Sequence, residues 1–257
     1  MGETLAAIED WRRGAARLAE DVAADWGLTL GRPYVPGAAG HVVRAELADG
    51  TPAVLKLFWP HREAEQEADA LERWDGDGAV RLLARDDARS ALLLERCEPG
   101  SFLSEASADV DRLGVLIGLL PRLWKRAEGF HSLTDEVAWW DLDGSVGALA
   151  RELAATQGDL VLVHQDLHGE NVIAAQREPW LVIDPKPLAA EREFAVAPIV
   201  RSFELGRSKR DVFYRLDRLC AELGLDRERA RGWTIVHTVA WGGDSSVDRS
   251  EVVEWLR

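Results

Sequence analysis

The chain has 257 residues, a formal net charge of -14 and 47% hydrophobic residues. This length allows one large domain or two small ones, and the hydrophobic content is ordinary for a protein that buries a sizeable core. The acidic balance argues against nucleic acid as a partner, because phosphates attract lysine and arginine, but it is compatible with a cationic ligand. We expect no membrane association, because no apolar run approaches the roughly 20 residues of a membrane span.

Two features bear on the cellular compartment. The sequence that follows Met1 is polar and charged, so we expect no signal peptide. The two cysteines, Cys97 and Cys220, lack the spacing of a metal site and need no disulfide. A reducing cytoplasm fits this cysteine usage.

The first part of the chain predicts one helix followed by a β-rich stretch. Leu5 to Trp26 has apolar residues at steps of three or four, which predicts an amphipathic helix. Residues 41–58 contain two strand-like runs around the dipeptide Asp49-Gly50, which favours a hairpin. The next expected elements are a helix over 61–74 and strands within 79–87 and 90–97.

The composition changes after Cys97, where a Pro-Gly pair suits a connector. Beyond it the sequence predicts mostly helices, over 109–131, 144–156, 211–224 and 227–241, with small β elements between them. We therefore expect two lobes, residues 1–97 and residues 98–257, joined near Glu95 to Gly100. A cleft between lobes is the natural ligand site.

The polar sequence HQDLHGEN, residues 164–171, lies between two apolar strand-like runs. It contains Asp166 and Asn171, and Asp184 ends the next apolar run. Asn171 and Asp184 would supply the oxygen ligands that Mg²⁺ prefers. Asp166 would stand beside them and accept a proton from a substrate hydroxyl. Taken singly, these residues would merely stabilise a turn, but the spacing of all three favours a catalytic site.

A second interpretation of the same loop is a metal-dependent phosphohydrolase that uses His164, Asp166, His168 and Asp184. The pattern H-x-D-x-H is similar to a dinuclear metal motif. Only two histidines cluster there and no further His-Asp partners follow, which disfavours this interpretation.

The order D-x-x-x-x-N followed by a strand-end Asp resembles the catalytic loop and metal-binding Asp of the protein-kinase-like fold. Two departures point away from protein kinases: Gln165 stands where they have arginine, and Asp184-Pro185 replaces their D-F-G. The chain is instead similar to the aminoglycoside phosphotransferases, in the streptomycin 6-kinase and hydroxyurea kinase branch. The segments that carry this resemblance are DGTPAVLKLF, ALERWDGDGAVRLLARD, LLLERC, VHQDLHGENVI and WLVIDPKPL.

This resemblance implies an α+β, bilobal protein-kinase-like fold, with a small β-rich N-lobe built on an antiparallel sheet and a larger, mainly helical C-lobe. It implies ATP and Mg²⁺ as cofactors and transfer of the γ-phosphate to a hydroxyl of a small molecule, such as streptomycin or a related aminoglycoside. Hydroxyurea and an amino sugar or other metabolite are alternative acceptors. A catalytically weak, nucleotide-binding pseudokinase-like protein is an alternative of another class. We expect a monomer or a homodimer.

The same resemblance implies a lysine and a glutamate that serve the nucleotide phosphates. Lys56, the only lysine of the N-lobe, would hold the α- and β-phosphates. Its partner should be a glutamate of the following helix, and the competing residues are Glu63, Glu65, Glu67 and Glu72. We choose Glu67, because it precedes Leu71 by one helical turn.

Two further segments are implied to contact ATP. Gly37 and Gly40 precede a strand, and small residues let backbone N–H groups approach phosphate oxygens. Glu95 to Cys97 resemble the kinase hinge, whose backbone would hydrogen-bond adenine.

In the C-lobe, Asp166 is the expected catalytic residue, and Asn171 and Asp184 are the expected metal ligands. His164 should brace the loop through a buried hydrogen bond, whereas Lys186 would lie either near phosphate or in solvent.

The acceptor pocket is less defined by the sequence. Acidic side chains would meet a cationic sugar and tryptophans would stack on it; the candidates are Asp141, Asp143, Glu191, Glu193, Glu204, Trp139, Trp140 and Trp241. Ala195 stands where related phosphotransferases keep an aspartate, so we expect the catalytic loop to be supported differently here.

Overall fold

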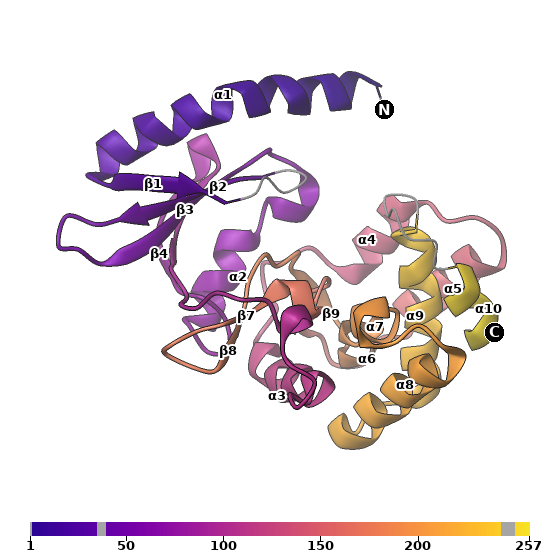
Figure 1. Cartoon of the computed structure of the whole chain (residues 1–257). Helices are drawn as coiled ribbons and strands as arrows, with labels where there is room; N and C mark the ends of the chain where they lie inside the picture. Colours follow the sequence, from indigo (N-terminus) through magenta and orange to yellow (C-terminus); the bar gives the residue numbers. More distant parts are fainter. Residues whose placement is uncertain (1, 35–39, 243–249) are drawn as a thin grey trace. The chain divides into compact units, whose positions relative to one another are not determined.

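The computed structural model describes residues 2–34, 40–242 and 250–257. The chain divides into two compact units, residues 1–100 and residues 101–257 (Figure 1). This division falls three residues after Cys97, the end of the predicted N-lobe. No helix in the described part of the chain is long and apolar enough to cross a membrane.

The first unit is built on one antiparallel sheet of five strands, in the order β1-β2-β3-β5-β4. The strands are β1 (Thr29–Pro33), β2 (Gly40–Glu46), β3 (Pro52–Phe58), β4 (Leu82–Asp86) and β5 (Ala91–Glu95). Strands β2 and β3 form the predicted hairpin, with Glu46 opposite Pro52. Gly50 in its turn has a φ of +85°, which glycine adopts without steric cost. Strand β3 therefore lies in the middle of the sheet, where its side chains are largely buried.

Two helices complete the first unit. Helix α1 (Gly2–Trp26) lies along the sheet, and its Ala19 and Val22 share one hydrophobic core with Leu55 and Leu57 of β3 (Figure 1). Helix α2 (Glu67–Trp74) covers only the second half of the helix predicted over 61–74. The first half contains a short 3₁₀ turn, η1 (Arg62–Ala64), and a second such turn, η2 (Asp87–Arg89), joins β4 to β5.

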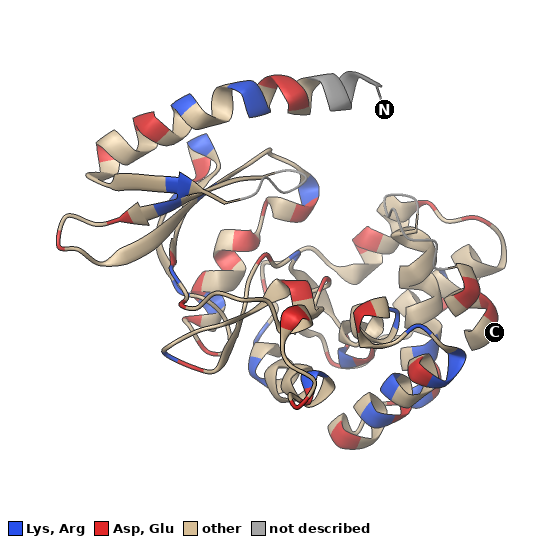
Figure 2. Ribbon diagram, viewed as in Figure 1, with Lys and Arg blue, Asp and Glu red and all other residues tan. Residues whose placement is uncertain are grey.

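Helices make up most of the second unit. They are α3 (Arg112–Leu123), α4 (Leu133–Trp140), α5 (Gly144–Ala155), α6 (Arg192–Ala195), α7 (Ala197–Val200), α8 (Lys209–Leu223), α9 (Arg227–Ala240) and α10 (Ser250–Leu256). Helix α9 packs against α5, α7 and α10 and buries Trp233 and His237, so it forms the centre of this core. Basic and acidic residues alternate on α8 (Figure 2), where Arg218 pairs with Glu222 one turn later.

Two helices differ from the sequence predictions. The helix predicted over 109–131 is only twelve residues long. It begins after Asp111, whose side chain accepts a hydrogen bond from the backbone N–H of Gly114, and it ends two residues after Pro121. Helix α4 was not predicted. Its start carries a recognisable signal, since Ser132 Oγ accepts a hydrogen bond from the backbone N–H of Asp135 at 3.1 Å.

Four short strands position the polar loop in the second unit. Strand β6 (Val161–Val163) pairs with β9 (Leu188–Ala190), and β7 (Val172–Ala174) pairs with β8 (Trp180–Val182). The loop runs from β6 to β7 and closes with the 3₁₀ turn η4 (Gly169–Asn171); the other 3₁₀ turns of this unit are η3 (Leu103–Glu105) and η5 (Phe203–Leu205). Buried strands therefore fix both ends of the loop.

Candidate active site

Lys56 occupies the centre of β3, opposite Val42 of β2 and Leu92 of β5. The residue is only 9% exposed, and a buried ammonium group needs a partner of opposite charge. That partner is Glu67, the first residue of α2, whose carboxylate oxygens lie 2.6 and 2.7 Å from Lys56 Nζ. Of the four competing glutamates, the structure thus pairs the lysine with the one that we chose from the sequence.

The other residues predicted to contact ATP belong to the same unit. Gly40 is the first residue of β2, opposite Phe58, whereas Gly37 lies outside the described residues. Glu95 ends β5, and its carboxylate accepts a hydrogen bond from the backbone N–H of Arg81 at 3.0 Å. Cys97 is buried. Contacts of these backbone groups with adenine or phosphate stay a prediction.

Asp166 and Asn171 are joined directly in the second unit. Asn171 Nδ2 donates to the main-chain oxygen of Asp166 at 2.7 Å and lies 3.2 Å from its carboxylate oxygen Oδ2. Both contacts use the amide nitrogen, so the amide oxygen is the atom that Asn171 would offer to a metal ion.

The two predicted metal ligands project from the same end of one β ribbon. Strands β7 and β8 pair directly, and the N–H of Ile183 donates to the main-chain oxygen of Asn171 at 3.0 Å. Asp184 follows with a φ of +55°, an uncommon backbone conformation for a residue other than glycine. Its side chain is 42% exposed, and the ammonium of Lys186 lies 2.8 Å from Oδ2. An amide oxygen and a carboxylate that already attracts a cation fit the ligand preference of Mg²⁺.

His164 braces the loop through a buried hydrogen bond, as the sequence predicted. Its Nε2–H donates to the main-chain oxygen of Ile183 at 2.9 Å, and the residue is 2% exposed. Burial lowers the pKa of His164 to about 4 despite the nearby charge of Asp166, so the ring is neutral at pH 7. The main-chain oxygen of His164 also accepts a hydrogen bond from the N–H of Lys186 at 3.0 Å.

Gln165, which stands where protein kinases have arginine, adopts a φ of +64°. This conformation costs a residue with a side chain about 1–3 kcal/mol and has to be held by its surroundings. The Gln165 side chain lies 3.4 Å from a carboxylate oxygen of Glu136, and its main-chain oxygen lies 3.1 Å from His237 Nε2 on α9. Glu136 and His237 are not predictable from the sequence, because contacts across 29 and 72 residues leave no local spacing pattern.

His168 lies between two carboxylates. Its Nε2 is 3.7 Å from Asp166 Oδ1, and its Nδ1 is 3.9 Å from Glu204 Oε2. Burial alone would lower the pKa of His168, but the two carboxylates outweigh it and raise the pKa to about 9. Burial would likewise raise the pKa of Asp166, but His168 reverses this and the pKa is lowered. Asp166 is therefore ionised at neutral pH, the state that a proton acceptor requires.

Ala195 is buried in α6. Glu136, Glu204 and His237 contact the loop from other elements. That this support differs from the support in related phosphotransferases stays a prediction.

The structure narrows the set of acceptor candidates. Glu191 is 2% exposed and is bound by Arg229, with 2.7 Å between Nη2 and Oε1, so the expectation that it meets an acceptor is wrong. Glu204 is engaged with the loop. Trp140 and Trp241 pack on aromatic neighbours inside the unit, with 6.4 and 5.0 Å from their ring centroids to that of His237. The exposed candidates are Trp139, Asp141 and Asp143.

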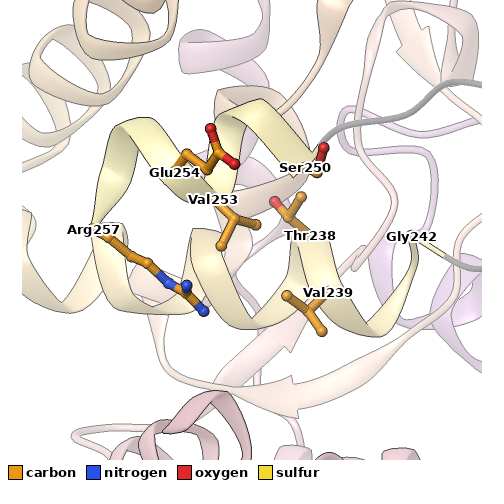
Figure 3. A pocket seen from close by; sticks show the side chains of 7 residues that line it. All are labelled: Thr238, Val239, Gly242, Ser250, Val253, Glu254 and Arg257. Atoms are coloured by element: carbon orange, nitrogen blue, oxygen red, sulfur yellow. The ribbon is translucent and has the colours of Figure 1, made fainter.

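A cavity of about 300 Å³ lies elsewhere in the second unit, between α9 and α10 (Figure 3). Thr238 and Val239 line it from α9, Val253 and Glu254 line it from α10, and Arg257 lines it from just after α10. None of its described lining residues belongs to the predicted nucleotide, metal or acceptor sets.

Comparison with solved structures defines the class of fold. A choline kinase from Streptococcus pneumoniae matches with a TM-score of 0.66 and 15% identity, covering 95% of this chain and 99% of that one. An aminoglycoside phosphotransferase matches with a TM-score of 0.60 and 13% identity, covering 94% of this chain and 95% of that one. The chain therefore has the α+β protein-kinase-like fold that the sequence predicted.

Comparison of sequences gives the family. The family model described as aminoglycoside/hydroxyurea antibiotic resistance kinase matches residues 26–252, and the chain belongs to this family. A hydroxyurea phosphotransferase of Kitasatospora aureofaciens is 41% identical over 237 residues, which cover 83% of this chain and 68% of that protein. A streptomycin 6-kinase of Streptomyces griseus is 38% identical over 250 residues, which cover 88% and 81%.

The predicted enzyme class is thereby confirmed. The chain is a small-molecule kinase, which uses ATP and transfers a phosphoryl group to a hydroxyl of its acceptor. The alternative of a metal-dependent phosphohydrolase is excluded by this membership. In the described part of the chain, no group of three or more His, Cys, Asp or Glu side chains is arranged to hold a metal ion.

Proposed function

We propose that this enzyme phosphorylates a hydroxyl group of an aminoglycoside, such as streptomycin. Streptomycin 6-kinases of Streptomyces griseus and Streptomyces glaucescens are 38% and 36% identical to the chain over most of its length, which supports this acceptor class. The observation that supports it best within the molecule is the contact of Asn171 Nδ2 with Asp166 Oδ2 at 3.2 Å. This contact places the predicted metal ligand beside the predicted proton acceptor on one loop.

In this proposal the first unit supplies the groups that bind nucleotide. Lys56 holds the α- and β-phosphates, and the two oxygens of Glu67 orient its ammonium group. The backbone at Gly37 and Gly40 serves the phosphates. The backbone from Glu95 to Cys97 serves adenine.

The second unit supplies the groups around the transferred phosphoryl. The amide oxygen of Asn171 and the carboxylate of Asp184 hold Mg²⁺, which would neutralise phosphate charge when bound. Lys186, paired with Asp184, adds a positive charge beside this carboxylate.

Asp166 acts on the acceptor. Its carboxylate aligns the acceptor hydroxyl and takes the proton as the oxygen bonds to the γ-phosphorus. The bond from that phosphorus to the bridging oxygen breaks, and ADP leaves with the electron pair. Positioning and charge neutralisation account for most of the rate in such transfers.

Hydroxyurea is the second candidate acceptor, because a hydroxyurea phosphotransferase is 41% identical to this chain. An amino sugar or another metabolite is a further alternative acceptor, and it could be cationic or neutral. In each case Asp166 would align the hydroxyl that is phosphorylated. A catalytically weak nucleotide-binding protein would keep the fold and turn over no acceptor.

A substrate screen tests the proposal. ADP release is measured with Mg-ATP and streptomycin, other aminoglycosides or hydroxyurea, and mass spectrometry identifies the phosphorylated product. Streptomycin-dependent ADP release that is lost in Asp166→Asn is the expected result. Turnover of hydroxyurea alone would replace the proposed acceptor, and ATP binding without turnover of any acceptor would favour the weak-kinase alternative.

We further propose that the enzyme acts in the cytoplasm as a monomer or homodimer. Both cysteines are buried thiols that are not joined in a disulfide, which supports a reducing compartment. Light scattering of the purified protein measures the oligomeric state.

A further inference from the structure

A glutamate far along the chain reaches the catalytic loop. Glu204, in the 3₁₀ turn η5, accepts a hydrogen bond through Oε1 from the backbone N–H of Gly169, 35 residues earlier. Its other oxygen, Oε2, lies 3.9 Å from His168 Nδ1, the ring nitrogen that also lies 3.3 Å from the backbone nitrogen of Glu170. One carboxylate therefore contacts both the backbone and a side chain of the loop.

The imidazole of His168 also contacts Asp166. The opposite ring nitrogen, Nε2, is 3.7 Å from Asp166 Oδ1 and 3.4 Å from Asn171 Nδ2. The distances to the two carboxylates are those of ion pairs rather than of direct hydrogen bonds. The ring thus stands between Glu204 and the carboxylate that faces the acceptor.

The surroundings strengthen these charge interactions. The side chains of Asp166, His168 and Glu204 are 16%, 25% and 15% exposed. Charge interactions that water screens little are stronger than those on an open surface. Without the ring, the Asp166 carboxylate would keep the contact of Oδ2 with Asn171 Nδ2 but lose the contact of Oδ1 with His168.

We propose that Glu204 and His168 are positioning residues, which hold the Asp166 carboxylate in the orientation that the acceptor hydroxyl needs. Glu204 fixes the turn at Gly169 and the ring of His168, and the ring fixes the carboxylate. The inference rests on the proposed role of Asp166 and adds two residues to it. Neither residue contacts ATP or the acceptor in this scheme.

The test uses Glu204→Gln, His168→Gln and the double variant in the full chain. Glu204→Gln keeps an oxygen for the Gly169 N–H but loses the charge. Each single change should lower kcat about tenfold or more. KM for ATP should stay unchanged. The double variant should lose little more than either single one, because coupled residues are not additive.

Two controls separate the possible outcomes. Glu191→Gln alters another buried glutamate of the same unit, so it should lower Tm while kcat of the folded protein stays the same. If Asp166→Asn is active, the proposed function fails. If Asp166→Asn is inactive but Glu204→Gln and His168→Gln keep the original kcat, the positioning role alone is overturned. Fully additive losses in the double variant would also overturn it.

Discussion

The ammonium of Lys56 lies 2.6 Å from the carboxylate of Glu67, and the two side chains are 11% and 2% exposed. A buried pair of this kind contributes little net stability, but removing one partner leaves a buried charge without compensation. The pair therefore couples the stability of the first unit to a group proposed to bind ATP.

The first prediction separates these two roles. Lys56→Ala should lower the free energy of unfolding by about 3 kcal/mol, because Glu67 stays charged and buried. It should also raise KM for ATP. The double variant Lys56→Met with Glu67→Leu should recover most of the stability and none of the activity. Chemical denaturation and steady-state kinetics measure the two effects, and recovery of activity would contradict the role of Lys56.

The second prediction concerns Asp166→Asn. The change removes a proton acceptor and no proposed ATP contact, so calorimetry should give an unchanged Kd for the nucleotide. Turnover should fall by about 10²–10⁴-fold, the range of general base catalysis. Asp159→Asn, at an exposed aspartate before β6, is the matched control and should behave as the original protein. Unchanged turnover in Asp166→Asn would contradict the assignment.

The third prediction concerns the pH dependence of stability, to which two histidines contribute with opposite signs. The folded-state pKa of His168 is about 9, above the value of about 6.5 in an unfolded chain. Its contribution is complete below pH 6.5 and is lost as the pH rises toward 9. The pKa of His164 is about 4, so its contribution is present above pH 6.5 and is lost as the pH falls toward 4.

Thermal denaturation across this pH range tests both signs. His168→Gln should flatten the decline of Tm between pH 6.5 and 9, and His164→Gln should flatten the decline between pH 6.5 and 4. Each variant serves as the control for the other. A basic limb that keeps its slope in His168→Gln would contradict the raised pKa.

The fourth prediction uses two glycines of the second unit. A Cβ atom at Gly169 would lie 2.7 Å from Glu204 Oε1 and 2.9 Å from the backbone nitrogen of Ser104. Gly169→Ala should therefore displace Glu204 or the turn, and lower both Tm and kcat. At Gly118, on the exposed side of α3, a Cβ would meet no atom within 4 Å. Gly118→Ala should stabilise the helix by about 0.5–1 kcal/mol without changing kcat. Equal effects on kcat at both positions would contradict the packing argument.

The sequence predicted the elements whose determinants are local. The hairpin around Gly50 follows from a dipeptide that tolerates positive φ, and α8 and α9 follow from apolar periodicity with caps at Ser208 and Asp226. The helix predicted over 109–131 was too long, because the apolar composition of this stretch does not show at which residues the helix begins and ends.

The residues of the candidate site also divide into those that a local pattern predicts and those that it does not. Asp166 and Asn171 share one loop, and their spacing was visible. The supporting residues Glu136, Glu204 and His237 contact the loop from other elements, so only the folded structure brings them to it. Glu204 was predicted as a possible contact of a cationic acceptor. Nothing in the sequence distinguishes an acidic side chain that faces a ligand from one that faces a backbone N–H.

The ribbon of β7 and β8 has a consequence for recognising distant relatives. Asn171 and Asp184 are held together by cross-strand pairing at the open end of the ribbon, and the turn over residues 175–179 lies at the other end. The turn can therefore lengthen or shorten in evolution without moving either predicted ligand. The number of residues between the asparagine and the aspartate is therefore a poor search criterion. Two short apolar strands that pair between these residues are a better one.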